Sequence, residues 1–169
     1  RSAGGLTRFG VEVVEEMNRL GMIVDVSHLS EPSFWDVIEY SHKPVIASHS
    51  NARTLCNHVR NLKDEQIRAL AENGGVMGVV FAPGFVDQEH ATLEGVLDHI
   101  DHIVDLVGPD HVGLGSDFDG ITSTPEGLED VSCLPSLTAG LIERGYTERN
   151  IKKILGENYL RVFEEVFED

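Results

Sequence analysis

A short apolar strand followed by an amphipathic helix recurs four times along this chain of 169 residues, and this repetition constrains the fold more than any other feature. The expected strands are the apolar runs 22–26, 44–47, 76–81 and 112–114. Short apolar runs that alternate with helices are typical of a parallel sheet buried on both faces. We therefore expect an α/β protein built from parallel βα units.

The helices are predicted from apolar spacing and from residues that start or stop a helix. Ser30 is expected as an N-cap, and Gly21 and Gly74 as stops. One helix stripe is expected from Val13, Val14, Met17 and Leu20, and a longer apolar face from Val96, Leu97, Ile100, Ile103, Val104 and Val107. The predicted helices span residues 9–20, 31–41, 64–73, 93–107, 134–144 and 148–167.

The length of the chain fits half of a closed barrel. Each of the four units takes about 42 residues of the 169, whereas a (β/α)8 barrel has eight units and typically ~250 residues. We expect residues 1–169 to form a single domain equal to half of a TIM-like barrel. Half a barrel leaves two strand edges unpaired, so a longer chain, a second copy or a partner chain is expected to complete it. A self-contained open sheet of four strands is the alternative.

The charge of the chain excludes two classes of partner. Asp and Glu number 29 against 13 Lys and Arg, which gives a net charge of −16. A surface this acidic repels nucleic-acid phosphates and anionic lipids, and it favours a small-molecule substrate. No apolar run approaches the ~18 residues that span a bilayer, and residues 1–5 lack the apolar core of a signal peptide. We therefore expect a cytoplasmic location, and we expect Cys56 and Cys133 to be free thiols.

Two histidines follow neighbouring strands at equivalent positions. His28 ends Asp25-Val-Ser-His28, and His49 ends Ala47-Ser-His49. Adjacent strands lie ~4.8 Å apart, so the two imidazoles can share one metal ion, and zinc accepts histidine nitrogen at ~2.0–2.1 Å. We expect His28 and His49 to bind a catalytic metal, with zinc as the favoured ion. The alternative is two loop histidines with ordinary hydrogen bonds.

Further candidate side chains lie in the loops after the strands. Asp117 follows the fourth strand at the level of the histidines and is expected to move a proton during hydrolysis, with a helix N-cap or an Asx-turn as the alternative. Asp119 either orients the site or caps a turn. Arg53 and Arg60 each have the fork geometry that binds a substrate carboxylate, and an ordinary surface position is the alternative for both. His58 lies near this site and its role is open.

The remaining motifs narrow the chemistry. His99 and His102 lie one turn apart on the helix 93–107, and we expect them on a solvated helix surface rather than at a metal. There is no P-loop, no GxGxxG after a strand and no GxSxG elbow in the sequence, so nucleotide binding and serine hydrolysis have no support.

Nine segments, in order along almost the whole chain, carry a resemblance to a known family. They are Gly5–Gly10, Met17–Gly21, Asp25–His28, Ser48–Ser50, Arg60–Asn61, Asp98–His102, Gly115–Gly120, Pro125–Val131 and Asn158–Val162. Together they resemble the membrane (renal) dipeptidases, which are zinc-dependent peptidases of the amidohydrolase-like barrel type.

The resemblance implies a fold, a reaction and a set of roles. It implies that this chain is the C-terminal half of a TIM-like barrel with a binuclear zinc site, and that the reaction is the hydrolysis of dipeptides, often with a D-residue on the C-terminal side. His28 and His49 resemble the histidines of the second zinc, Arg60 the arginine that binds the substrate's C-terminal carboxylate, and Asp117 the acid/base carboxylate. The first-zinc ligands, the bridging glutamate and a further substrate-binding histidine are expected to precede Arg1.

Two rival hypotheses use the same residues. The first is another amidohydrolase-like barrel hydrolase that acts on an amide, a lactam or a lactone. The second is an inactive, truncated domain that associates with itself as a homodimer, because two half-barrels can close on each other.

Overall fold

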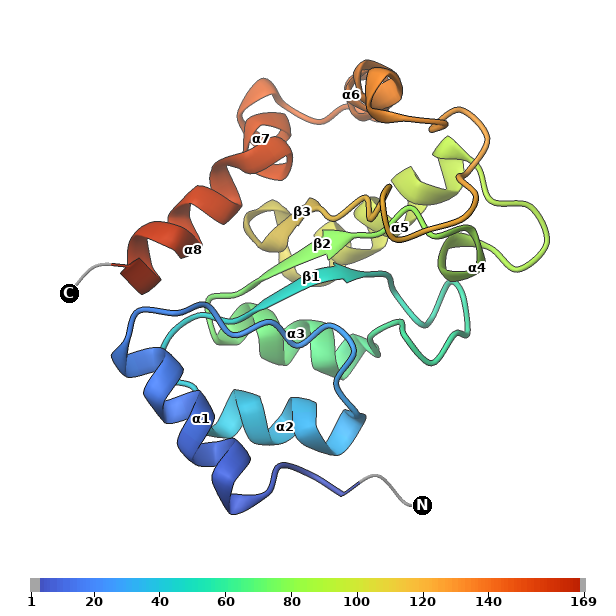
Figure 1. The fold of residues 1–169 in the computed structure, drawn as a ribbon. Coiled ribbons are helices and arrows are strands. Elements are labelled where there is room, and N and C mark those ends of the chain that lie inside the picture. Colours follow the sequence, from blue (N-terminus) through green and yellow to red (C-terminus); the bar gives the residue numbers. More distant parts are fainter. Residues whose placement is uncertain (1–3, 168–169) are drawn as a thin grey trace.

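The computed structural model describes residues 4–167, so the ends of the expected domain, residues 1–3 and 168–169, lie outside the described part (Figure 1). Three strands form a single parallel sheet in the order β1 (Ile46–Ser50), β2 (Val76–Val79) and β3 (Val112–Leu114). The predicted α/β class with parallel βα units is confirmed for these three strands.

The helices agree closely with the periodicity of the sequence. Ser30 caps α2 as predicted, because its hydroxyl accepts a hydrogen bond from the Ser33 backbone N–H at 3.3 Å. Among residues 4–167, no helix is long and apolar enough to cross a lipid bilayer. The helices are α1 (Arg8–Arg19), α2 (Glu31–Tyr40), α3 (Asp64–Glu72), α4 (Pro83–Val86), α5 (Leu93–Val107), α6 (Leu134–Glu143), α7 (Glu148–Lys152) and α8 (Asn158–Phe167), with short 3-10 helices at Pro109–His111 and Val131–Cys133.

Each face of the sheet packs against a different group of helices. Met77, Val79 and Val112 belong to the main core, which they share with buried side chains of α2, α3, α5 and α6. The opposite face carries Val76 and packs against α8 through a smaller apolar cluster. In Figure 1, α1, α2 and α3 lie below the sheet and α8 lies above it, near the strand starts. The sheet is therefore covered on both faces, which explains why β2 and β3 contain only apolar residues and glycine.

The first predicted strand, residues 22–26, is wrong as a full strand. It makes only an isolated pairing with β1, in which Val26 N–H donates to the Ile46 carbonyl at 2.8 Å and Ile46 N–H donates to the Val24 carbonyl at 3.0 Å. The chain then turns away, because His28 adopts a positive φ of 72°. The second strand is shifted relative to its prediction over residues 44–47, so that His49 lies within β1 instead of just after it.

Two helix predictions also need correction. The single helix predicted over residues 148–167 is divided by a π-helical turn, Lys153–Glu157, in which Gly156 leaves the helical region with ψ −27° and φ 170°. The apolar stripe of α1 is not buried as a whole: Val14 is buried, but Val13 and Leu20 are exposed. The apolar face predicted on α5 is confirmed, because its first four members are fully buried.

Candidate metal centre

An irregularity in β1 determines where His49 points. Ala47 pairs with Met77 and Ser50 pairs with Val79, so β1 advances by three residues over a stretch in which β2 advances by two. This is a β-bulge, which places an extra residue in one strand and redirects the side chains beside it. Without the bulge, strict alternation would place His49 on the same face as Ala47, in the main core.

Two glycines provide the space for this bulge. The Ser48 carbonyl leaves the ladder and lies over Gly78 and Gly115, where a Cβ on either glycine would collide with it. Gly115 belongs to the predicted motif after β3, and Gly78 lies within β2. The glycines are therefore required by close backbone approach, and they help to fix the position of His49.

The two predicted histidines face each other. Their Nε2 atoms lie 2.8 Å apart, and the ring centroids are 4.9 Å apart with an interplanar angle of 57°. His28 is exposed and His49 is half-buried. Two imidazole nitrogens directed at one point are a pair of donors for a shared proton or for a metal ion.

A relay of hydrogen bonds fixes the tautomer of His49. The Ser48 hydroxyl lies 2.5 Å from the Asp25 Oδ2 and 2.7 Å from the His49 Nδ1. A carboxylate only accepts, so the hydroxyl donates to Asp25 and accepts from the Nδ1–H of His49. The lone pair of His49 therefore lies on Nε2, the atom that faces His28. A hydrogen-bonded partner on the far ring nitrogen is the usual arrangement around a metal-ligating histidine.

Backbone strain occurs at two of the predicted site residues. Among residues 4–167, His28 with φ 72° and Asp117 with φ 63° are the only residues other than glycine that have a positive φ. This region costs an L-residue free energy, and such residues cluster at functional sites. The strain is consistent with a functional requirement at both positions.

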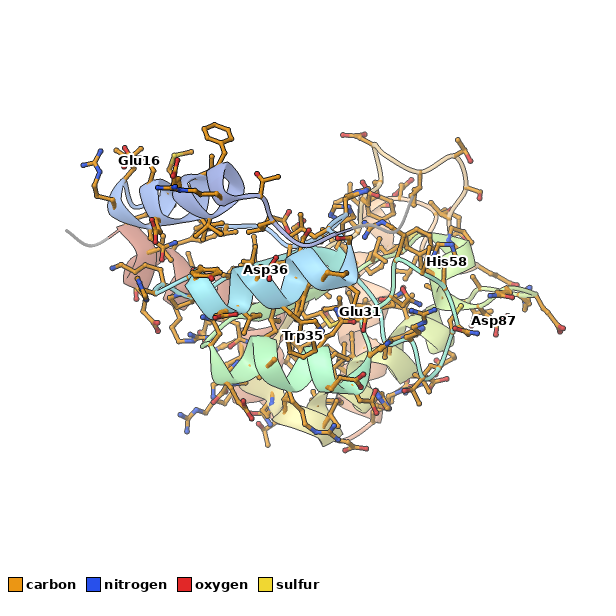
Figure 2. All side chains as sticks on the ribbon, turned by 90° about the horizontal axis from the view of Figure 1, so that it is seen from below. Glu16, Glu31, Trp35, Asp36, His58 and Asp87 are labelled. Carbon is orange, nitrogen blue, oxygen red and sulfur yellow. The ribbon has the colours of Figure 1, made fainter. Side chains whose placement is uncertain are left out.

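Arg60 is the more enclosed of the two candidate arginines. Its Nη2 atom is buried, and its guanidinium lies 5.7 Å from the centre of the Phe85 ring. His58, labelled in Figure 2 on the long loop after β1, stacks on Phe85 at 4.2 Å, and its Nδ1 accepts the Arg60 backbone N–H at 3.2 Å. Arg53 instead donates to Asn57 on the same loop at 3.1 Å. The structure thus gives His58 a supporting position beneath Arg60.

The four predicted residues share one electrostatic environment. Burial lowers the pKa of His49, the Asp117 carboxylate opposes this shift, and the Arg60 and His28 charges reinforce it. Burial also lowers the pKa of Arg60, and the charges of Asp117 and Asp25 oppose that change. His49 is therefore biased towards the neutral form that binds metals. Asp117 also lines an open cleft of about 700 Å³ together with Asp119, which is itself exposed.

The chemistry of these donors fits part of a zinc site. Two ligands at ~2.0–2.1 Å in tetrahedral geometry lie roughly 3.3 Å apart, so the 2.8 Å gap between the Nε2 atoms needs to open by only about half an ångström to admit zinc. Within residues 4–167 there is no group of three or more His, Cys, Asp or Glu side chains arranged to hold a metal. His28 and His49 therefore fit zinc as two ligands of an incomplete set, because catalytic zinc sites use three protein ligands.

The prediction for the other histidine pair is wrong in part. His99 is only 1% exposed and does not lie on a solvated surface. Its Nδ1 accepts the Ala52 N–H at 3.2 Å, and its Nε2 donates to the Val86 carbonyl at 3.1 Å. His102 is half-buried and lies 2.9 Å from the Asp64 carboxylate. His99 therefore holds the loop after β1, and His102 holds the start of α3. The prediction of free thiols is confirmed for Cys56 and Cys133.

The sequence reasoning missed three supporting residues. Asp25 and Ser48 hold His49, and Phe85 lies beside Arg60. A signal existed only for Asp25, because a carboxylate inside the apolar run 22–26 needs a polar partner when it is placed in a sheet. The partner itself depends on the bulge, which has no pattern in the sequence.

Comparison with known proteins identifies the family. The model of the family described as Membrane dipeptidase (Peptidase family M19) matches residues 1–168. The Dipeptidase tcpJ of Claviceps purpurea (strain 20.1) is 47% identical over 164 residues, which are 96% of this chain and 39% of that protein. The Dipeptidase verJ of Clonostachys rogersoniana is 46% identical over 165 residues, 98% of this chain and 42% of that protein.

A solved structure agrees with these relatives. The metallo peptidase from Rhodobacter sphaeroides, liganded with a phosphinate mimic of the dipeptide L-Ala-D-Ala, superimposes with a TM-score of 0.92 at 41% identity, covering 97% of this chain and 48% of that one. The chain thus spans about two fifths of the two curated relatives and about half of this solved chain. A match along nearly all of its length shows that the chain belongs to the membrane dipeptidase family, peptidase family M19.

Proposed function

We propose that this chain contributes one side of the active site of a zinc-dependent dipeptidase. The observation that carries the proposal is the meeting of the His28 and His49 Nε2 atoms, 2.8 Å apart, in the same electrostatic environment as Asp117 and Arg60. The relative from Rhodobacter sphaeroides, which holds a phosphinate mimic of a dipeptide, supports the same substrate class for this chain.

Residues 1–169 are proposed to form one domain that is the C-terminal half of a TIM-like (β/α)8 barrel. The outer edges of residues 24–26 and of β3 have no strand beside them within residues 4–167. The coverage of about half of the solved chain supports the same view. A complete barrel would pair both edges and bring further ligands to the two histidines, in a binuclear zinc site.

Each residue has a separate part in the proposed reaction. His28 and His49 would hold zinc, and the Asp25–Ser48 relay keeps the Nε2 lone pair of His49 directed at it. When bound, zinc supplies Lewis-acid activation of the peptide carbonyl and of the attacking water. Asp117 would accept the proton of that water and return it to the leaving amine. Arg60 would bind the substrate's C-terminal carboxylate through its planar fork.

The test compares Arg60→Met with Arg53→Met in the full-length, zinc-loaded protein. Arg60→Met removes the guanidinium that binds the substrate's carboxylate, and this loss is expected to raise KM for dipeptides about 100-fold. Arg53→Met should behave as wild type. Dipeptide amides, which lack the carboxylate, should be poor substrates of the wild type and should lose nothing further in Arg60→Met. An equal loss on dipeptides and their amides would contradict the assigned role of Arg60.

Two alternatives have their own measurements. The similar structure of an amidohydrolase from Pseudomonas aeruginosa, with a TM-score of 0.91 and 33% identity, supports hydrolysis of other amide-type substrates as the alternative reaction. A panel of dipeptides, lactams and lactones separates these reactions. A second copy of the chain could instead pair the open edges, and light scattering of the 169-residue chain distinguishes a monomer from such a homodimer.

A further inference from the structure

Three buried polar atoms without a protein partner surround one small cavity behind Arg60. They are the Ser50 Oγ, the Arg60 Nη2 and the Asn61 Oδ1, and none has a hydrogen-bond partner among residues 4–167. Ser50 is 0% exposed and Asn61 is 3% exposed. The three residues line a cavity of about 40 Å³, whose other polar walls are Glu31, Arg53 and Gln66. Native proteins rarely leave such groups unpaired, so the cavity requires an occupant.

The chemistry of the walls selects the occupant. The Asn61 amide has a fixed orientation, because its Nδ2 donates to the Cys56 carbonyl at 2.9 Å and to the Phe85 carbonyl at 2.8 Å. Its Oδ1 is therefore an acceptor. Arg60 Nη2 can only donate, and the Ser50 hydroxyl can do either. The occupant must accept from Arg60 and donate to Asn61, which excludes an anion and also excludes a metal cation.

A single water molecule meets these requirements. A water needs roughly 10–15 Å³ of the space that a water-sized sphere can occupy, and the cavity of about 40 Å³ exceeds this requirement. Buried waters typically make about three hydrogen bonds, and the three unpaired atoms supply that number. We propose that an internal water bound by Ser50, Arg60 and Asn61 fixes the position of the Arg60 guanidinium.

This water would make Ser50 and Asn61 positioning residues for substrate binding, an inference that rests on the proposed function of Arg60. Within residues 4–167, the side chain of Arg60 makes no hydrogen bond or ion pair with protein, and its described support is the Phe85 ring at 5.7 Å. The water would tie it to the end of β1, the strand that also carries His49. The arginine and the histidine pair would thereby share one rigid support.

The experiment uses Ser50→Val and Ser50→Thr in the full-length protein. The two side chains have the same shape, so the added methyl group is common to both and only the hydroxyl differs. A high-resolution crystal structure should show one water within hydrogen-bond distance of all three atoms in the wild type and in Ser50→Thr. Ser50→Val should raise KM for dipeptides about tenfold relative to Ser50→Thr, with kcat changed by less than about twofold.

Each outcome decides the proposal. A wild-type cavity without water density, or with the anomalous signal of a halide, overturns it, and equal KM values in the two variants overturn the positioning role. If Ser50→Val does not fold, the wild-type density and the KM of Ser50→Ala against wild type still decide. Absence of dipeptide turnover in the wild type would refute the proposed function. The electron density in the cavity would still show, independently of turnover, whether the water is bound.

Discussion

Two glycine-to-alanine substitutions on the face of the sheet beneath α8 should have different consequences. A Cβ at Gly113 would collide with the Tyr159 ring, which supplies its three nearest atoms, including Cδ2 at 3.0 Å and Cζ at 3.2 Å. A Cβ at Gly78 would collide with the Tyr159 hydroxyl and also with the Ser48 carbonyl. A side chain can move aside, but the carbonyl belongs to the bulge that directs His49.

The expected magnitudes follow from these contacts. Overpacking a closed core costs ~1–3 kcal/mol, and removing a strand glycine returns roughly 0.5–1 kcal/mol of chain entropy. Gly113→Ala and Gly78→Ala should therefore each lose about 1–2 kcal/mol of unfolding free energy. In a Tyr159→Leu background the cost of Gly113→Ala should fall to near zero, a coupling within the ~0.5–3 kcal/mol seen for contacting residues. Gly78→Ala should keep most of its cost.

Urea unfolding of the full-length protein, followed by circular dichroism, measures these differences. Gly84→Ala is the matched control, because nothing lies within 4 Å of its Cβ position, and it should leave the unfolding free energy within about 0.5 kcal/mol of wild type or raise it. Gly78→Ala should also weaken zinc binding, since it displaces the bulge. The reasoning is refuted if Gly113→Ala costs the same in both backgrounds, or if Gly78→Ala is as harmless as Gly84→Ala.

Three further predictions concern hydrogen bonds and ion pairs. Ser48→Ala should weaken zinc binding about 10–100-fold in a competition titration, because it frees the tautomer of His49; an unchanged affinity would argue against the relay. Arg144→Met should cost about 1–2 kcal/mol in urea unfolding, because it leaves three carboxylates of α5 without their shared cation, and a loss below 0.3 kcal/mol, roughly the value of an exposed pair, would contradict this. Burial raises the pKa of Asp64, but hydrogen bonds from His102 and Thr54 outweigh it and lower the pKa overall. The stability that results is present above about pH 4 and is lost as the pH falls through the lowered pKa of the folded state. Asp64→Asn should therefore flatten the acid side of a plot of unfolding free energy against pH, and curves that run parallel for the variant and the wild type would disprove the link.

Local signals explain why much of the fold is readable in the sequence. The bounds of α5 and β3 agree with their apolar runs, and Ser30 caps α2, because these features depend on spacing and on caps within a few residues. The proximity of His28 and His49 was also predictable, since the segments that carry them run parallel and adjacent.

Long-range contacts determined the rest of the site. The bulge in β1 needs Gly78 in β2 and Gly115 just after β3, and no linear pattern in the sequence shows that they accommodate the Ser48 carbonyl. The chemistry of Arg60 and Arg53 is the same, and the resemblance alone favoured Arg60 until the structure showed it packed beside Phe85. His99 was expected in solvent, yet the loop after β1 and α4 bury it.

The sequence by itself therefore determined the order of most helices and strands, the parallel arrangement and the proximity of the two histidines, because the spacing and capping signals for these features lie within one turn or one strand. Only the tertiary structure decided the direction of His49, the relay from Asp25 through Ser48, and the enclosure of Arg60. These features arise where segments more than 20 residues apart in the sequence meet. The burial and hydrogen bonding of each side chain therefore depend on residues that are distant in the sequence.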